Sequence, residues 1–322
     1  MTAIAATAEA PVMSSAFRCM GCEAEIVVVG GPPSLVAEAR ARVDELEGRW
    51  SRFIESSDIS RCNRAAGRSR AVSVETGLLV ERAMEGRVLT GGHFDPTVVD
   101  ALGAWGYDRT FRRVATNDTR RAPSRRAAGG GQVDLRRPFG RRARVRLAPG
   151  VGLDPGGVGK GLAADIVVNE LIDRGADGAC VNLGGDIRVA GRPPTDAGWQ
   201  IAVEDPWDAE ELARVALTDG AVVTSTIVHR AWRRGGVPAH HIIDPSTGAP
   251  ATSGVVSATV LAPEAWRAEV VATAIIVAGV DAGRLLVDGL GRGHAALIVQ
   301  ADAMVVLVGD VATLDEIVWR AR

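Results

Sequence analysis

The stretch "LDPGGVGKGLAADI", residues 153–166, carries four closely spaced glycines and the only lysine of the chain. Glycines allow a backbone to approach a ligand closely, and a helix predicted over 158–174 would point its first N–H groups and its positive dipole end at that ligand. Lys160 would add a compact positive charge that suits a phosphate oxygen. The other interpretation is a tight strand–helix turn with a solvated lysine, and this segment alone favours neither.

The two common nucleotide-binding motifs are absent from this stretch. A P-loop would need glycine where Asp154 stands and Ser or Thr where Gly161 stands. A dinucleotide-binding fingerprint that begins at Gly157 would need glycine where Leu162 stands. A phosphate site here would therefore depend on the glycines, the helix N-terminus and Lys160.

Composition sets the class of protein. The 322 residues suffice for one large domain or two ordinary ones, and 47% hydrophobic with 24% charged residues is typical of a globular chain. The net charge of −2 gives no general attraction to nucleic acid or anionic lipid. The apolar stretch 270–280 is too short to span a bilayer, and residues 1–19 lack the pattern of a secretion signal. We expect a cytoplasmic protein without a membrane span or a nucleic-acid partner.

Arginine is concentrated in one segment. Residues 112–146 hold twelve arginines against Asp118 and Asp134, a net charge of +10, which leaves −12 on the rest of a chain whose total is −2. Such a block around "AAGGGQ" predicts a mobile, solvated loop. A nucleic-acid or phosphate patch is the alternative, which the near absence of aromatic residues disfavours.

Hydrophobic periodicity predicts a mixed α+β chain in which helices cover sheets. Strands are predicted over 23–30, 143–148, 179–182, 186–190, 199–204, 213–218, 255–261, 295–300 and 303–309. Helices are predicted over 34–53, 76–90, 158–174, 264–278 and 281–289, with a further helix that begins near Pro96.

The four cysteines do not form a recognisable zinc site. Cys19 and Cys22 make a C-x-x-C without a second pair, whereas Cys62 and Cys180 stand alone. A redox C-x-x-C normally opens a helix, but this one leads into the predicted strand 23–30. We interpret the four residues as unpaired, buried or partly buried thiols.

Two further segments contain side chains suited to chemistry. In "HHIIDPSTG", His240 and His241 would point to opposite faces of a strand, so one of them would face a site. In "WRAEVVATAIIVAG", Glu269 and Thr273 stand at i and i+4 on an apolar helix, where a carboxylate needs a partner. Their oxygens suit a hard cation such as Mg²⁺. Alternatively, Glu269 lies in an exposed first turn and Thr273 bonds back along its own helix.

Taken together, these segments resemble the ApbE family of FAD:protein FMN transferases. The matching motifs run in order along nearly the whole chain, and only the segment 112–146 has no clear counterpart. They are "MGCEAEIVV", "SRFIESSDISRCNRAAG", "GHFDPTVVDALGAWGY", "LDPGGVGKGLAAD", "VNLGGDIRVAG", "WQIAVEDP", "VVTST", "HHIIDPSTGAP" and "AEVVATAIIVAG".

The resemblance implies an α+β fold in which FAD lies in the cleft between two sheet-plus-helix halves. We expect a single domain over 1–322, with an N-terminal half of about 16–111, the arginine-rich insertion at about 112–146 and a C-terminal half of about 147–322. The implied reaction is Mg²⁺-dependent: FMN passes from FAD to a Ser or Thr hydroxyl of an acceptor flavoprotein, and AMP is released. An FAD pyrophosphatase and a non-catalytic FAD-binding protein are the alternatives.

The resemblance also implies site residues. His241 would act near the reacting phosphate, and Lys160 would neutralise charge on it. The implied flavin-binding residues are Met20, Phe53, His93, Phe94, Asp95, Asp154 and Lys160. The implied Mg²⁺ ligands are the Gly157 and Ala272 carbonyls, the Glu269 carboxylate and the Thr273 hydroxyl. Three positions depart from the family pattern: Glu269 replaces the usual Asp, Phe53 a common Tyr, and Thr226 a Gly.

Overall fold

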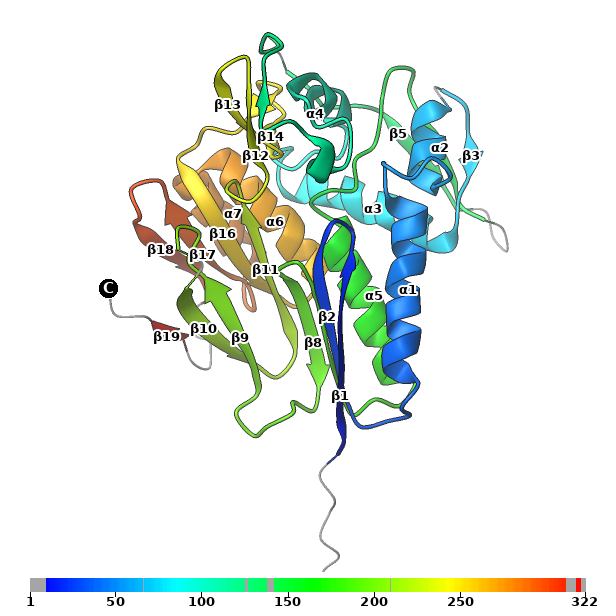
Figure 1. The fold of residues 1–322 in the computed structure, drawn as a ribbon, viewed down its shortest axis with the longest axis vertical. Coiled ribbons are helices and arrows are strands. Elements are labelled where there is room, and N and C mark those ends of the chain that lie inside the picture. The colour runs from blue at the N-terminus through cyan, green and yellow to red at the C-terminus, as the bar shows by residue number, and fades with distance from the viewer. Residues whose placement is uncertain are drawn as a thin grey trace, which may run out of the picture.

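An eight-stranded sheet is the centre of the computed structural model, which describes residues 10–65, 67–124, 127–137, 142–208, 210–310 and 317–319 (Figure 1). The order is β1 (Val12–Cys19), β2 (Cys22–Val29), β7 (Gly178–Leu183), β8 (Asp186–Gly191), β11 (Gly220–Thr226), β16 (Val255–Ala262), β17 (Ala295–Gln300) and β18 (Val305–Gly309). Every neighbouring pair is antiparallel. The strands of the two expected halves meet in this sheet, where Ile26 pairs with Val181.

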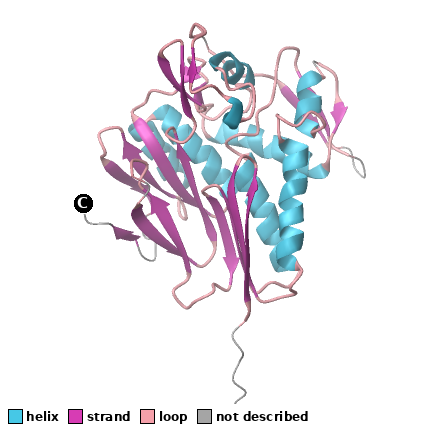
Figure 2. Ribbon diagram, in the orientation of Figure 1, coloured by secondary structure: helices cyan, strands magenta, loops and turns pink. Residues whose placement is uncertain are grey.

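Helices gather on one face of the sheet (Figure 2). They are α1 (Leu35–Trp50), α3 (Val74–Leu89), α5 (Gly159–Asp173), α6 (Ala265–Ala278) and α7 (Val280–Leu290). The main core lies between these helices and the sheet. Helix α6 is apolar almost all round and buried along most of its length, as expected for a helix packed on several sides. This burial fixes the position of the polar side chains that α6 carries.

A smaller sheet packs on the opposite face. It consists of β9 (Trp199–Glu204), β10 (Glu211–Leu217) and β19 (Ile317–Trp319). In β9 every second residue is buried, so Trp199, Ile201 and Val203 point to a second core shared with Val189 and Val222 of the central sheet.

Short elements cover the end of the sheet where the site is expected. They are α2 (Asp58–Arg64), α4 (Val99–Trp105), β4 (Asn117–Asp118), β12 (Ala231–Arg234), β13 (Val237–His240), β14 (Ile243–Asp244) and β15 (Ala249–Pro250). A third, aromatic core joins α4, β12, β13, β14 and β15. The Trp105 indole N–H donates to the Gly248 carbonyl at 2.9 Å, and the Trp232 indole N–H donates to the Trp105 carbonyl at 2.9 Å. These bonds fix α4 against the loop that follows His241.

The arginine-rich segment is not one solvated loop, so that prediction is wrong for its described residues. They include η1 (Phe111–Arg113) and β4, and they also include β5 (Val133–Arg136) and β6 (Arg144–Leu147). Strand β6 pairs with β5 on one side and with β3 (Arg70–Ala71) on the other. Exposed arginines alternate with buried Val145 and Leu147 in β6, so the overall charge conceals a period-two pattern. The predicted loop positions Arg125, Arg126 and Arg141 lie outside the described residues.

Most predicted elements are present, with shifted ends. The first helix stops at Trp50 because Ser51 takes an extended backbone, so Phe53 stands in the loop beyond it. Helix α4 starts at Val99 instead of near Pro96, because the Asp95 carboxylate accepts from both the N–H and the hydroxyl of Thr97. No helix within the described ranges is long and apolar enough to cross a membrane.

Candidate functional site

The glycine-rich turn before α5 touches α6 and the GHFD loop. Gly157 has a φ of +94°, which favours glycine, and a Cβ there would lie 3.0 Å from Phe94 Cε2 and 3.2 Å from Thr273 Oγ1. The Ser225 hydroxyl of β11 lies 3.5 Å from the Thr273 hydroxyl. The structure therefore brings together Gly157, Phe94 and Thr273, which are far apart in sequence.

Lys160 stands in the first turn of α5 between two buried carboxylates. Its ammonium forms an ion pair with Asp186 at the start of β8 and lies 3.3 Å from Oε1 of Glu269. Glu269 is only 2% exposed, and its Oε2 accepts a 2.9 Å hydrogen bond from the Gly161 N–H. The alternative in which Glu269 lies exposed in the first turn of its helix is therefore wrong.

Two buried carboxyl groups of this cluster share one ammonium. Burial and the neighbouring Glu269 raise the pKa of Asp186 well above its usual range. Burial alone would lower the pKa of Lys160, but the two carboxylates outweigh it and raise that pKa. One ammonium therefore faces two carboxyl groups, and the raised pKa of Asp186 favours its protonated form, whereas a bound cation would favour the ionised form of both groups. Within the described ranges, no three His, Cys, Asp or Glu side chains form a metal-ligating cluster, so a cation would also need carbonyl or hydroxyl oxygens.

The two histidines have different environments. His240 ends β13 and is buried: its Nε2 bonds to the Ala251 carbonyl at 3.0 Å, and its Nδ1 accepts from the Ile242 N–H at 3.3 Å. These bonds use both ring nitrogens in backbone contacts. In contrast, the buried Nδ1 of His241 has no hydrogen-bond partner among the described residues. Burial, Arg230, His240 and Lys160 all lower the pKa of His241, so its imidazole is neutral at physiological pH.

The tip of the first hairpin and Arg230 lie near Lys160. Met20 (φ +47°) and Gly21 (φ +76°) form the turn between β1 and β2, and a Cβ on Gly21 would lie 3.9 Å from Nη2 of Arg230. The half-buried Arg230 has no ion pair with any described residue, yet its charge acts on Cys22 and His241. Arg230 and Asp186 are not among the predicted site residues, because nothing in their local sequence patterns marks them.

Arg52 links the two predicted flavin-binding residues Phe53 and Asp154. The guanidinium carbon of Arg52 lies 4.1 Å from the Phe53 ring centre and 4.7 Å from that of Tyr107. Its Nε lies 3.4 Å from Oδ1 of Asp154, which also accepts from the Gly156 N–H at 3.0 Å. Arg52 and Tyr107 were not predicted as site residues, although both lie inside motifs that carry the family resemblance.

The residues of the GHFD motif lie in different environments. His93 is exposed, and its N–H donates to the Thr90 carbonyl at 3.2 Å. The buried Asp95 carboxylate accepts from the Gly130 N–H at 2.7 Å and lies 3.0 Å from Nε of Arg87. Asp95 thus ties its loop to the arginine-rich segment, whereas Phe94 lies against Gly157 of the glycine turn. The Thr226 hydroxyl donates to the Val256 carbonyl at 3.1 Å.

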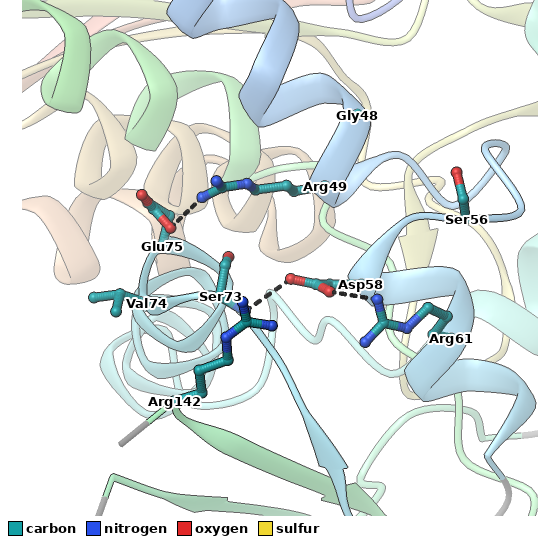
Figure 3. A pocket seen from close by; sticks show the side chains of 9 residues that line it. All are labelled: Gly48, Arg49, Ser56, Asp58, Arg61, Ser73, Val74, Glu75 and Arg142. Atoms are coloured by element: carbon teal, nitrogen blue, oxygen red, sulfur yellow. Dashed lines mark hydrogen bonds and ion pairs between the residues drawn. The ribbon is translucent and has the colours of Figure 1, made fainter. Parts of the chain in front are cut away.

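A cavity of about 430 Å³ lies elsewhere, among α1, α2 and α3 (Figure 3). It contains none of the predicted site residues. Figure 3 shows Arg49 directed at Glu75 and Arg61 at Asp58, so carboxylates in the wall already pair with these two arginines. We therefore place the candidate site at Lys160 and not in this cavity.

The model of the ApbE family matches residues 20–298 of the sequence. The chain belongs to the ApbE family. The matched range begins at the hairpin turn and contains all the predicted site residues from Met20 to Thr273. An ApbE origin accounts for the ordered series of motifs, and it supports the α+β class that the sequence predicts.

Curated relatives carry the name FAD:protein FMN transferase. The one from Vibrio cholerae serotype O1 is 28% identical over 258 residues, which is 79% of this chain and 76% of the relative. The one from Rhodobacter capsulatus is 30% identical over 285 residues, which is 85% of this chain and 53% of the relative. This chain therefore spans about half the length of the Rhodobacter protein.

Solved ApbE structures share the fold. The ApbE protein of Thermotoga maritima superposes with a TM-score of 0.83 at 28% identity and covers 95% of this chain and 100% of its own. The flavinyl transferase ApbE of Pseudomonas stutzeri gives 0.79 at 25% identity and covers 96% and 98%.

Proposed function

We propose that this chain is an FAD:protein FMN transferase, which moves the FMN portion of FAD to a Ser or Thr hydroxyl of an acceptor protein and releases AMP. The relatives' names support the reaction class. The observation that carries the proposal is the position of Lys160, at the N-terminus of α5 between Asp186 and Glu269 and beside the Gly157–Thr273 contact. A positive charge beside the N–H groups of a helix N-terminus is the arrangement that binds a pyrophosphate.

In this proposal the flavin and the pyrophosphate contact different parts of the site. Phe53, with Tyr107 behind it, offers an aromatic face, and Met20 contributes from the hairpin turn. Lys160 and the half-buried Arg230 face the phosphates from two sides. Both are cations close enough to His241 to lower the pKa of its imidazole.

The residues around Glu269 fit a Mg²⁺ ion. Two buried carboxyl groups share one ammonium, so a cation would favour their ionised forms, and the available donors are oxygens, which Mg²⁺ prefers. Glu269, the Thr273 hydroxyl and the carbonyls of Gly157 and Ala272 would hold it. When bound, it would supply positive charge against the phosphate oxygens. Glu269 reaches the N-terminus of α5 from α6, so its longer side chain still delivers a carboxylate to this place.

His241 would receive the proton of the acceptor hydroxyl. A hydroxyl is a poor nucleophile at neutral pH, and a base within reach helps by roughly 10² to 10⁴-fold. The imidazole of His241 is neutral and its Nδ1 is unpartnered among the described residues, whereas the ring of His240 is engaged. Lys160 would meanwhile offset charge that develops on the phosphate oxygens.

The test combines two products. The protein is incubated with FAD and Mg²⁺ in the presence of a library of Ser- and Thr-containing peptides. AMP is measured by chromatography, and peptides that gain FMN are identified by mass spectrometry. We expect both products, and neither with Lys160→Ala. AMP with free FMN and no modified peptide would reassign the site to an FAD pyrophosphatase, and the absence of AMP would overturn the proposal.

A further inference from the structure

The sequence Cys19-Met20-Gly21-Cys22 closes the β1–β2 hairpin, and its two cysteines lie directly opposite each other. Opposed residues of an antiparallel pair have Cα atoms about 4.5–5.5 Å apart, within the span of a disulfide. Both thiols are free in this structure. The Cys22 thiol donates a 3.2 Å hydrogen bond to the Cys19 carbonyl, so Cys22 Sγ is already turned back toward its partner.

Cys22 faces the candidate site. A Cβ on Gly184 would lie 2.8 Å from Cys22 Sγ, so this sulfur packs on the Gly184–Gly185 turn that leads to Asp186. Hydrogen bonding with Cys19 lowers the pKa of Cys22 to about 7, and Lys160 and Arg230 act in the same direction against burial. A partly exposed thiol beside two cations is the setting in which cysteines react as thiolates.

Cys19 has the complementary properties. It is 4% exposed, and the hydrogen bond with Cys22, burial and the charge of Cys22 all raise its pKa. Two of these three effects come from the Cys22 sulfur as a thiolate, and they end once that sulfur is bonded to another group. Cys19 is therefore protected at first and is released by the reaction of its neighbour.

Cys62 and Cys180 differ from this pair in the pKa of their thiols and in having no cysteine opposite them. Burial raises the pKa of Cys62 to about 11 and that of Cys180 to about 12. Neither is paired with a second cysteine across a turn. They are internal controls for thiol reactivity in the same molecule.

We propose that Cys19 and Cys22 are a redox-sensitive pair at the rim of the site, in which Cys22 reacts first and Cys19 closes an intrachain disulfide. With a small disulfide R–S–S–R as the oxidant, the Cys22 thiolate attacks one sulfur, and R–S⁻ leaves and takes up a proton. Cys19 then loses its proton and attacks Cys22 Sγ, and the second R–S⁻ leaves. The two cysteines lose two electrons, which reduce one R–S–S–R to two R–SH.

Closure would act on the flavin site through Met20. The disulfide would restrain the turn that carries Met20, whose φ of +47° is uncommon for a residue with a side chain, and would remove the thiolate that faces Lys160 and Arg230. We expect the disulfide form to bind FAD more weakly than the dithiol form. This second consequence rests on the proposed flavin site, whereas disulfide formation does not.

The experiment treats the reduced full-length protein with oxidised glutathione, then counts thiols and measures the intact mass. Wild type should lose two of its four thiols and the mass of two hydrogens. Cys19→Ser should stop at a glutathione adduct on Cys22, and Cys22→Ser should react far more slowly. The Cys62→Ser/Cys180→Ser double variant should still lose two thiols and the mass of two hydrogens, as wild type does.

Retention of all four thiols by wild type, or equal reactivity of Cys22→Ser and wild type, would overturn the pair. FAD titration of the oxidised and re-reduced forms gives the second readout. Weaker binding that a reductant restores supports control of the flavin site, and equal affinities overturn that control. If neither form binds FAD, the proposed function fails, and the thiol result is judged by itself.

Discussion

The Gly161 N–H donates a 2.9 Å hydrogen bond to Oε2 of Glu269, so the first turn of α5 is bonded directly to the carboxylate that α6 brings to the site. The helices can approach this closely because residue 161 has no side chain. A Cβ there would lie 2.4 Å from the Ala265 carbonyl oxygen, which is backbone and cannot rotate away.

Gly161→Ala should therefore separate α5 from α6. We expect a loss of about 1–3 kcal/mol in the free energy of unfolding, measured with urea, together with weaker FAD binding. Gly48→Ala is the matched control, because Gly48 also lies in a helix and a Cβ there meets nothing within 4 Å. It should stabilise the protein by roughly 0.5–1 kcal/mol. Similar effects of both substitutions would refute the close-contact argument.

Asp165 should link the stability of the protein to pH. Its two oxygens accept from the Ala265 and Trp266 N–H groups at 2.9 Å each, and burial raises the pKa of its carboxyl to about 7 from 3.8. A raised folded-state pKa means that the folded form holds the proton more tightly. This stabilising contribution is complete below pH 3.8 and is lost as pH rises through about 7.

Asp165→Asn removes this titration and one of the two acceptors. We expect a variant that is less stable than wild type, because Asn has a single oxygen for two helix N–H groups. The difference in unfolding free energy between the two proteins should change between pH 5 and pH 8, whereas Asp302→Asn, on the surface, should show no such change. A constant difference for Asp165→Asn would show that Asp165 does not titrate between pH 5 and pH 8 in the folded protein.

His241→Ala should separate binding from chemistry. We expect FAD affinity and thermal stability near wild type, with AMP release reduced by roughly 10² to 10⁴-fold. His240→Ala is the neighbouring control: it breaks bonds to Ala251 and Ile242 and should lower the melting temperature. Normal turnover by His241→Ala would place the base elsewhere.

Removal of the Lys160 charge should weaken both FAD binding and turnover. Lys160→Ala leaves Asp186 and Glu269 without their ammonium, so FAD affinity and AMP release should both fall. Lys160→Arg should bind FAD but turn over slowly, because a planar fork does not fit the space of a point charge between two carboxylates. Full activity of Lys160→Arg, measured as kcat and KM for FAD, would contradict this role.

Glu269→Gln should remove most of the Mg²⁺ dependence of FAD binding. The amide keeps the shape of the side chain but removes one of the charges that call for a cation. Titration of flavin fluorescence with and without Mg²⁺ measures the effect, with Glu264→Gln, on the exposed start of the same helix, as the control. If wild type binds FAD equally well in both conditions, the metal assignment is wrong.

Sequence patterns predicted the elements well where periodicity was clear. The apolar runs of β16, β17 and α6 and the i, i+4 spacing of Glu269 and Thr273 were readable because each is a local property. Asp186 and Arg230 were not, since only folding brings β8 and the loop after β11 to Lys160. In the arginine-rich segment, charge concealed the alternation of β6.

The single lysine has a practical consequence for labelling. Since no other side-chain amine exists in the chain, an acyl group or an amine-directed reagent that modifies a lysine can do so only at Lys160. The extent of modification at Lys160, read at that residue by mass spectrometry, then reports on the site without a background from other lysines, and bound FAD should shield it. Enzymatic acetylation of a lysine side chain could likewise occur only at Lys160. We therefore expect every molecule acetylated on lysine to be inactive.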